Sequence, residues 1–321
     1  MKRIGGFFEL EIAKGDSLYH DDAIKLSTGR ACLNYVLQAL KPSKVYVPYY
    51  CCDALYEPMT LLDIEFEFYE IDNQLEIKSL PELDTDEIIV YCDFFGVKSE
   101  YTTSLISKYS SRLIIDNSHS FYKKQLNANS ISFTTARKYF GVPDGAFLYI
   151  PKKYKINQLI NRNIKVSINH NTHSLLGFQD LAYSEFSEYE KSLNSEIKGI
   201  SILSEKILQT LNYKEIRAIR NRNFNFFREE FNSFNNIMIA DDEIDCFCYP
   251  LLLDRPIKKE ELYNEKIYLP NYWLDTTARL DSLNFEFETK ISTQLLPLPI
   301  DHRYTIEDLK RVSQAIKSRI Q

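Results

Sequence analysis

The chain has 321 residues, a formal net charge of −6 at pH 7 and apolar side chains at 44% of its positions. This length suits two domains, because a domain runs to roughly 100–200 residues, and the apolar share is enough for a large core. The acidic balance, with no basic stripe, predicts that nucleic acid is not a partner. No apolar run approaches the ~20 residues of a bilayer span, so we expect no membrane segment.

Cysteine and histidine usage indicates a reducing compartment without a metal site. None of the six cysteines stands in a CxxC pair, and residues 1–16 lack the apolar core of a signal peptide. His170 and His173 form an HxxH pair with no accompanying cluster of carboxylates or cysteines, which favours a loop over a metal site. We therefore expect a cytoplasmic protein with free thiols and no metal.

Helical and strand-like patterns alternate along the first half of the chain. Residues 29–40 carry apolar side chains at helical spacing, and a second helical pattern lies around residues 104–109. Short apolar or alternating runs predict strands at residues 44–47, 64–68, 88–91, 113–115, 131–133 and 146–150. Strands that alternate with helices predict a mostly parallel, doubly wound α/β sheet.

The second half of the chain has a different character. Residues 179–233 are long, charged and helical in pattern, and a smaller α+β region follows from about residue 244. In that region we expect strands at 246–252 and 267–269 and helices at 258–263 and 305–320. The predicted large domain is 14–180. Residues 181–321 form a helical connection and a small C-terminal α+β domain, with which residues 1–13 are expected to pack.

Candidate ligand-binding residues follow from the sheet, because open α/β sheets bind ligands at the carboxyl ends of their strands. Gly29 and Arg30 open the helix at 29–40, where free backbone N–H groups and the helix dipole favour a phosphate. The alternative is an ordinary helix start. Asp116 ends an apolar strand, where a carboxylate needs a partner such as a protonated ring nitrogen, or else caps a loop. His119 could bond to or stack on such a ring, or be structural.

Hydroxyl residues and a lysine follow the strand at 131–133. Ser132, Thr134 and Thr135 offer hydroxyls that could bind phosphate, and Lys138 could bond covalently to an aldehyde. The alternative for Lys138 is a surface basic pair with Arg137. The order of phosphate-binding turn, strand-end aspartate and hydroxyl-flanked lysine is that of fold type I enzymes that use pyridoxal 5′-phosphate (PLP).

These segments together resemble the DegT/DnrJ/EryC1/StrS aminotransferase family over nearly the whole chain. The similar segments are 28–33, 47–52, 93–96, 116–119, 132–138, 144–146 and 296–308. The resemblance implies the PLP-dependent transferase fold type I, with a mostly parallel seven-stranded sheet between helices and a smaller α+β C-terminal domain.

The resemblance also implies residue roles. Lys138 would anchor PLP, Asp116 would meet the pyridine nitrogen, His119 would lie near the phenolic oxygen, and Ser132 would bind the phosphate. The family's ring-stacking aromatic aligns formally with Cys52, and we expect Tyr50 to take its place. Counting back from Asp144-Gly145 rather than forward from Ser132 identifies Lys138 as the anchor.

The implied activity is transfer of an amino group, from a donor such as glutamate, to a keto sugar carried on a nucleotide. The start at residues 4–10 and the segments 137–145 and 299–304 are similar to a branch of the family associated with bacterial surface-polysaccharide genes. Family members are homodimers with the site at the interface, and Arg303 and Trp273 are candidates for the substrate side. Other PLP chemistry on a sugar or amino acid, or a non-catalytic protein with this fold, are the alternatives.

Overall fold

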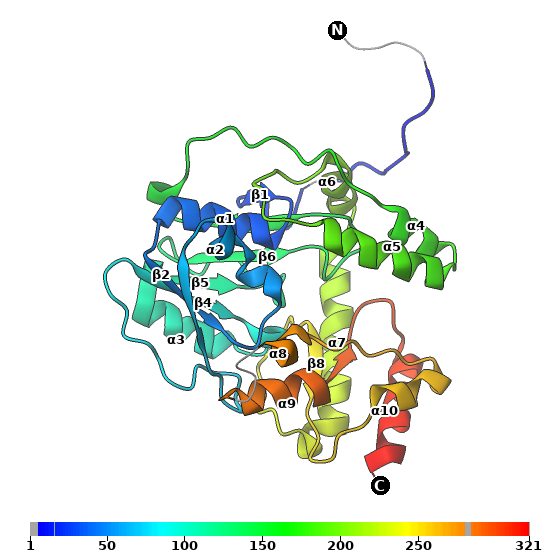
Figure 1. Ribbon diagram of the computed structural model, residues 1–321. Helices are drawn as coiled ribbons and strands as arrows, with labels where there is room; N and C mark the ends of the chain where they lie inside the picture. Colours follow the sequence, from blue (N-terminus) through cyan, green and yellow to red (C-terminus); the bar gives the residue numbers. More distant parts are fainter. Residues whose placement is uncertain (1–5, 16, 280–283, 321) are drawn as a thin grey trace.

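The computed structural model of the chain describes residues 6–15, 17–279 and 284–320 (Figure 1). Seven strands form the main sheet in the order β1-β7-β6-β5-β4-β2-β3. Strands β2 to β6 run parallel to one another, whereas β7 is antiparallel to both β6 and β1. The predicted mostly parallel sheet of seven strands is confirmed. Its strands are β1 (Ile24–Leu26), β2 (Lys44–Pro48), β3 (Glu65–Tyr69), β4 (Glu87–Cys92), β5 (Leu113–Asp116), β6 (Ile131–Thr135) and β7 (Ala146–Tyr149).

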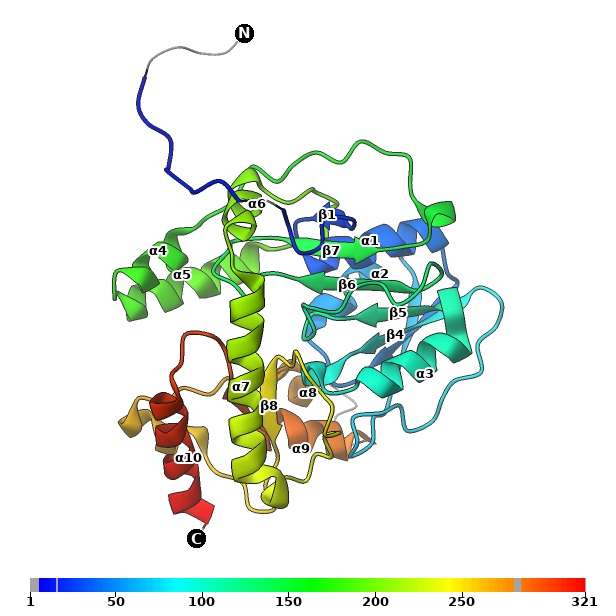
Figure 2. The same cartoon turned by 180° about the vertical axis from the view of Figure 1, so that it is seen from behind.

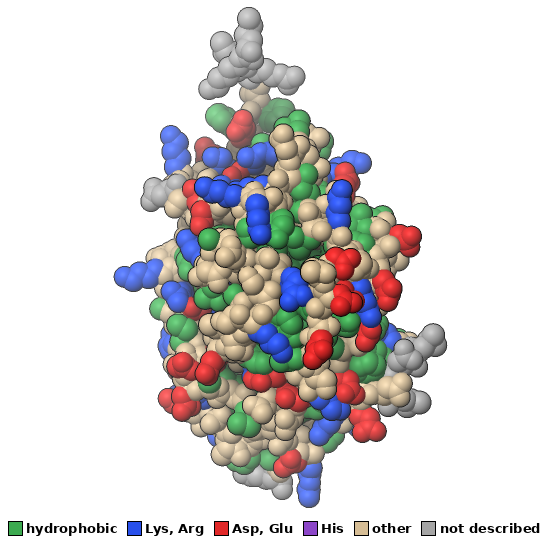
Figure 3. Space-filling model, turned by 90° about the vertical axis from the view of Figure 1, so that its left-hand side faces the viewer, with side chains coloured by type: hydrophobic (Ala, Val, Ile, Leu, Met, Phe, Trp, Pro, Cys, Tyr) green, Lys and Arg blue, Asp and Glu red, His purple; other side chains and the backbone are tan. Residues whose placement is uncertain are grey.

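Helices cover both faces of this sheet. Helices α1 (Gly29–Leu40) and α2 (Glu57–Leu61) lie in front of the strands in Figure 1, and α3 (Ser99–Tyr109) lies in front of them in Figure 2. The central strands are therefore buried on both sides, which explains the continuous apolar run of β4. On the face seen in Figure 3, acidic and basic side chains are interspersed, and neither sign forms one continuous patch.

A second sheet and the remaining helices form the C-terminal part of the chain. Strands β8 (Cys248–Leu251) and β9 (Leu296–Pro299) pair antiparallel. The expected helical stretch contains α5 (Gln179–Ser192), α6 (Ile202–Gln209) and α7 (Tyr213–Phe231), and the closing helix is α10 (Ile306–Ile320). Short helices complete the set, namely α4 (Asn169–Leu175), α8 (Asp275–Ala278) and α9 (Glu286–Gln294).

Three details of the C-terminal half differ from the prediction. The helix expected at 258–263 is a 3-10 helix, Lys259–Glu265. The strand expected at 267–269 is wrong, because these residues have no strand assignment, although Ile267 and Leu269 are buried in the core. Helix α9 had no counterpart in the sequence prediction.

The N-terminal segment does not pack as expected in the single chain. Residues 1–5 lie outside the described part, and residues 6–13 extend away from the molecule beyond α6 (Figure 2). Phe7 and Phe8 are almost fully exposed. Among the described residues, no helix combines the length and apolar character that a bilayer crossing needs.

A buried histidine under β7 makes the stability of the fold depend on pH. His20 is fully buried, with Nε2 2.6 Å from the Phe121 carbonyl oxygen and Nδ1 2.8 Å from the Tyr149 hydroxyl. Burial lowers the pKa of His20 to about 4 from 6.5, so the unfolded chain takes up a proton first as the pH falls. We expect the free energy of unfolding to drop by about 3 kcal/mol between pH 6.5 and pH 4 through this group alone.

Urea unfolding across this pH range tests the expectation for His20. A His20→Gln variant should lack this part of the pH slope. A variant with the same slope as the wild type would contradict the assignment.

Candidate active site

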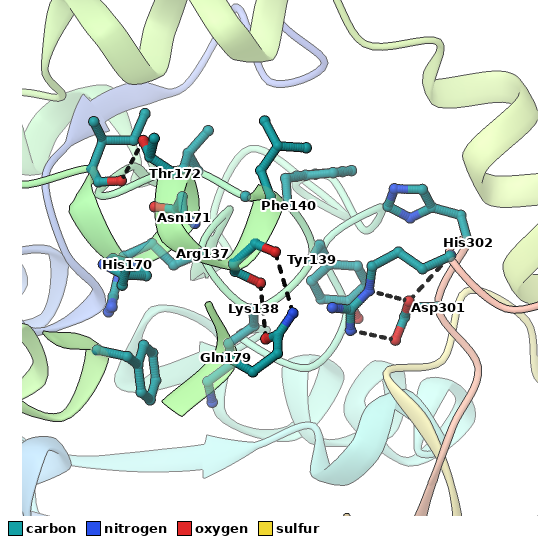
Figure 4. A pocket seen from close by; sticks show the side chains of 17 residues that line it. Arg137, Lys138, Tyr139, Phe140, His170, Asn171, Thr172, Gln179, Asp301 and His302 are labelled. Atoms are coloured by element: carbon teal, nitrogen blue, oxygen red, sulfur yellow. Dashed lines mark hydrogen bonds and ion pairs between the residues drawn. The ribbon is translucent and has the colours of Figure 1, made fainter. Parts of the chain in front are cut away.

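Two pockets meet at the carboxyl ends of the parallel strands, and Lys138 lines both. The inner pocket has a volume of about 310 Å³ and is lined by the turn before α1, by the ends of β5 and β6 and by the turn after β2. The outer pocket has a volume of about 810 Å³ and opens between residues 137–142, helix α4 and residues 301–303. Figure 4 shows the outer pocket, with Lys138 at its floor beside Arg137 and Tyr139. Both volumes fall in the range of ligand pockets, ~300–1,000 Å³.

Lys138 is hydrogen-bonded to His119. The Lys138 Nζ lies 3.0 Å from His119 Nε2, and the backbone N–H of Phe95 donates to His119 Nδ1 at 3.2 Å. The imidazole is 3% exposed, and burial, with a further contribution from the charge of Lys138, holds the pKa of His119 well below its usual range. His119 is thus a neutral side chain that contacts the lysine directly.

Asp116 is one of four carboxylates that line the inner pocket, with Asp53, Glu190 and Asp275. It ends β5, as expected, and its Oδ1 accepts a hydrogen bond from the Ser118 N–H at 2.8 Å. Its Oδ2 lies 4.0 Å from the Cys92 thiol. Burial raises the pKa of Asp116 above its ordinary value, whereas Lys138 opposes this shift. Burial of the charged Asp116 carboxylate therefore costs free energy in the ligand-free protein. A cationic ligand group beside Asp116 would lower this cost.

The sign of this shift gives a test on the ligand-free protein. Because the folded state holds the Asp116 proton more tightly than the unfolded chain does, wild-type stability falls as the pH rises through the raised pKa. Asp116→Asn removes that loss. In urea unfolding, we expect the stability of Asp116→Asn relative to wild type to increase as the pH is raised from 4 toward 7. A difference in the free energy of unfolding that stays constant over this range would contradict the raised pKa of Asp116.

The turn before α1 also lines the inner pocket. Thr28 caps the helix by accepting the Ala31 N–H at 3.0 Å, and a side chain at Gly29 would meet Thr135 Cγ2 at 3.2 Å. Gly29 and Arg30 line the pocket, as expected. The Arg30 guanidinium is also engaged, since it donates to the Leu193 carbonyl oxygen and pairs with Glu57. The Thr135 hydroxyl is buried here without a hydrogen-bond partner.

Ser132 does not line the inner pocket. Side chains alternate between the two faces of a strand, so Phe133 and Thr135 point toward Gly29, whereas Ser132 points to the other face. Ser132 lines a separate cavity of about 190 Å³ beside α3. Of the hydroxyl residues left open by the sequence, Thr135 lines the inner pocket, whereas Ser132 does not.

Tyr50 does not line the inner pocket either, and Cys52 takes that place. The Tyr50 ring is fully buried against Phe94 and Trp273. The chain turns after β2, and Arg279 fixes this turn by donating to the carbonyl oxygens of Tyr49 and Cys51. The turn leaves Cys52 among the pocket residues. Tyr50 was expected over a bound ring, and the structure places Cys52 rather than Tyr50 in the lining of the inner pocket.

The two residues expected on the substrate side differ in position. Arg303 lines the outer pocket, where its guanidinium donates two hydrogen bonds to Asp301 at 2.7 and 3.0 Å. Trp273 stacks on the His119 ring instead. The outer pocket has further polar atoms that are buried without partners, on Arg137, His170, Asn171 and His302. These groups had not been singled out from the sequence as substrate-binding residues.

No family model matches the chain, and no curated protein matches it by sequence. Solved structures do match. A DegT DnrJ EryC1 StrS aminotransferase from Brucella abortus is 15% identical, with a TM-score of 0.61, over 92% of this chain and 85% of that one. Sugar aminotransferase CalS13 from Micromonospora echinospora is 13% identical, with a TM-score of 0.66, over 94% and 88%.

The putative sugar aminotransferase Spr1654 from Streptococcus pneumoniae, in its PMP form, is 12% identical, with a TM-score of 0.66, over 95% of this chain and 92% of that one. The chain has the fold of these aminotransferases. At such low identity the likeness concerns the fold, and the activity has to be argued from the site.

Proposed function

We propose that the protein is a PLP-dependent aminotransferase that moves an amino group from a small amino donor to a keto sugar. The observation that carries the proposal is the position of Lys138. Its amine lies where the inner and outer pockets meet and is hydrogen-bonded to His119 at 3.0 Å. Among the described residues that line either pocket, Lys138 is the one lysine.

The inner pocket suits two charged groups of PLP. The buried Thr135 hydroxyl lacks a partner, and it lies beside Gly29 at the N-terminus of α1, which suits a phosphate. Asp116, in the same pocket, is a carboxylate with a raised pKa, and a protonated ring nitrogen would supply the positive charge that it lacks. The pocket thus combines a place for an anionic group with a place for a cationic group of one ligand.

The protein residues have distinct tasks in this reaction. When bound, PLP supplies an aldehyde that takes up the amino group and a ring that accepts electrons. Lys138 would hold the cofactor covalently at rest, and its freed amine would then move the proton at the substrate carbon. Asp116 would stabilise positive charge at the ring nitrogen, and His119, which contacts Lys138 Nζ at 3.0 Å, would position the lysine.

The outer pocket provides the substrate side. Arg137 and Arg303 are on its walls, paired with Glu190 and Asp301 in the ligand-free protein, and His170 has a buried Nδ1 without a partner. Such groups suit a hydroxylated acceptor with an anionic portion, which supports a sugar on a nucleotide, and a dicarboxylate donor such as glutamate. The resemblance supports a role in surface-polysaccharide synthesis, and the free cysteines suit the reducing cytoplasm.

We also propose a homodimer whose partner covers the outer pocket. Leu175 on α4 is 86% exposed, although it lines the outer pocket. A set of large apolar side chains is also exposed on α5 and the turn that joins it to α4, namely Leu176, Phe178, Leu181, Tyr183 and Phe186. Apolar surface gathered in this way indicates an interaction site.

Light scattering tests the proposed dimer face. Leu175→Glu should yield a monomer, whereas Leu126→Glu, at another exposed leucine, should not. A dimeric Leu175→Glu variant would contradict the proposed face.

Reductive trapping tests the function. The purified protein should bind PLP with a visible absorbance band, lose that band on borohydride reduction, and then carry the cofactor mass on the peptide that contains Lys138. Amino donors should discharge the band without reduction. A colourless protein that cannot be loaded with PLP, or a label on another lysine, would overturn the proposal.

A further inference from the structure

The ring of His119 is held by aromatic side chains from the C-terminal part of the chain. Phe247 stacks on it with ring centres 4.4 Å apart and an angle of 10°, and Trp273 does so at 5.3 Å and 9°. Trp273 is the only tryptophan of the chain. Two nearly parallel neighbours confine the imidazole to one plane, so its nitrogens can point in few directions.

Phe95 determines how the His119 ring is oriented within that plane. Phe95 has a φ of 57° and lies next to Gly96, whose φ is 77°. This turn directs the Phe95 N–H to His119 Nδ1, and Phe247 in turn donates its N–H to the Phe95 carbonyl oxygen at 2.8 Å. A side chain at Gly96 would meet the His119 carbonyl oxygen at 2.4 Å, so the turn and the histidine backbone are in close contact.

These contacts assign the proton of the imidazole. Nδ1 accepts the Phe95 N–H and therefore carries no proton. A neutral imidazole with a bare Nδ1 has its proton on Nε2. Nε2 is then the nitrogen that contacts Lys138 Nζ, at 3.0 Å.

We propose that Trp273 and Phe247 are positioning residues that clamp His119 in its Nε2–H tautomer, so that Nε2 faces Lys138 Nζ and holds this nitrogen where the two pockets meet. The attack of Lys138 on an aldehyde depends on where its nitrogen lies. The role of the clamp in cofactor capture rests on the proposed function, whereas the clamp itself does not.

The surroundings of His119 agree with this assignment. Burial is the main cause of the lowered His119 pKa, so the ring stays neutral. Trp273 itself has a φ of 57°, and its ring also contacts Tyr50 edge-on at 4.5 Å. A left-handed backbone at a bulky residue costs on the order of 1–3 kcal/mol, which the packing of this side chain has to offset.

Nitrogen NMR of the full-length, cofactor-free protein labelled with ¹⁵N-histidine tests the clamp. The His119 signals are those lost in His119→Gln. We expect the wild type to show the Nε2–H tautomer alone. Trp273→Leu should show a mixture of both tautomers, and Trp273→Phe, which keeps a stacking ring, should resemble the wild type. The control Phe94→Leu removes a ring that touches Trp273 and is expected to leave the tautomer unchanged.

A second measurement follows the covalent capture of added PLP by Lys138. Misplacement by about an ångström can cost 10²-fold in rate, so Trp273→Leu should slow capture by about 10–100-fold, with rescue by Trp273→Phe. Phe247→Leu should reproduce the NMR and kinetic effects if Trp273→Leu does not fold.

Two results would overturn the clamp: an Nδ1–H tautomer in the wild type, or Trp273→Leu with the wild-type tautomer and capture rate. Failure of the wild type to take up PLP would overturn the proposed function instead, and the NMR result would still decide the tautomer.

Discussion

Lys138→Ala is expected to lower the rate of amino-group transfer by at least about 10⁴-fold, because one side chain both holds the cofactor and moves the proton. No second lysine among the described pocket residues could replace it. Single-turnover transfer from glutamate, followed by the change in visible absorbance, measures the effect. The variant should still bind PLP without a covalent bond, through Asp116, Thr135 and the N-terminus of α1.

Two control variants separate chemistry from charge. Lys138→Arg keeps a cation at this position but cannot form the bond to an aldehyde, so it should be as inactive as Lys138→Ala. Lys124→Ala removes an exposed lysine away from both pockets and should transfer at the wild-type rate. Residual activity of Lys138→Ala within tenfold of wild type would exclude Lys138 as the proton carrier.

The main sheet was predictable because its strands are short apolar runs that are separated by helices. Strands β4 and β5 are buried on both faces, and their sequences, such as Leu113–Asp116, are apolar until the last residue. Strand β1 was missed because it has only three residues, Ile24–Leu26, and a lysine in the middle. Residues 267–269 were mistaken for a strand because burial alone, without a pairing partner, gives the same apolar pattern.

The candidate site was predictable for residues that stand at the start of a helix or the end of a strand, because the sequence pattern locates these points. Gly29 begins α1, and Asp116 ends β5, so both lie at the carboxyl edge of the sheet. Ser132 and Tyr50 do not line the inner pocket, because their positions depend on which face of β6 or which arm of a turn they occupy. Side chains alternate along β6, so Thr135, and not Ser132, shares a face with Phe133 and points toward Gly29. This alternation could have favoured Thr135 as the hydroxyl of the inner pocket.

Long-range contacts account for what the sequence could not reveal. Trp273 reaches His119 across more than 150 positions of the chain, through a segment without regular secondary structure. Similarly, Arg279 fixes the turn at residues 49–52 from the C-terminal part. No periodicity in the sequence encodes such contacts, since they depend on how the two parts of the chain pack together.

Asp144→Ala is expected to lower the free energy of unfolding by about 3–5 kcal/mol, because several buried donors lose their acceptor at once. The Asp144 side chain is fully buried. Its Oδ1 accepts the Ser201 and Ser204 hydroxyls at 2.7 and 2.5 Å, and its Oδ2 accepts the Ser201 N–H at 3.0 Å and the Asn163 amide at 3.1 Å. Guanidinium unfolding, followed by circular dichroism, measures the loss.

The position of Asp144 explains why the loss should also reach the candidate site. Ser201 is the N-cap of α6, so the carboxylate joins this helix start to the turn that carries Lys138 six residues earlier. The neighbouring Gly145 has a φ of 122° and fixes the return of the chain into β7.

Two control variants test the role of the Asp144 carboxylate. Asp144→Asn keeps one acceptor and should lose less stability than Asp144→Ala, whereas the exposed Asp242→Ala should change stability by no more than about 0.5 kcal/mol. Equal stabilities for Asp144→Ala and Asp242→Ala would show that the buried network contributes nothing, and a stable Asp144→Ala protein with wild-type PLP capture would show that the turn does not need it.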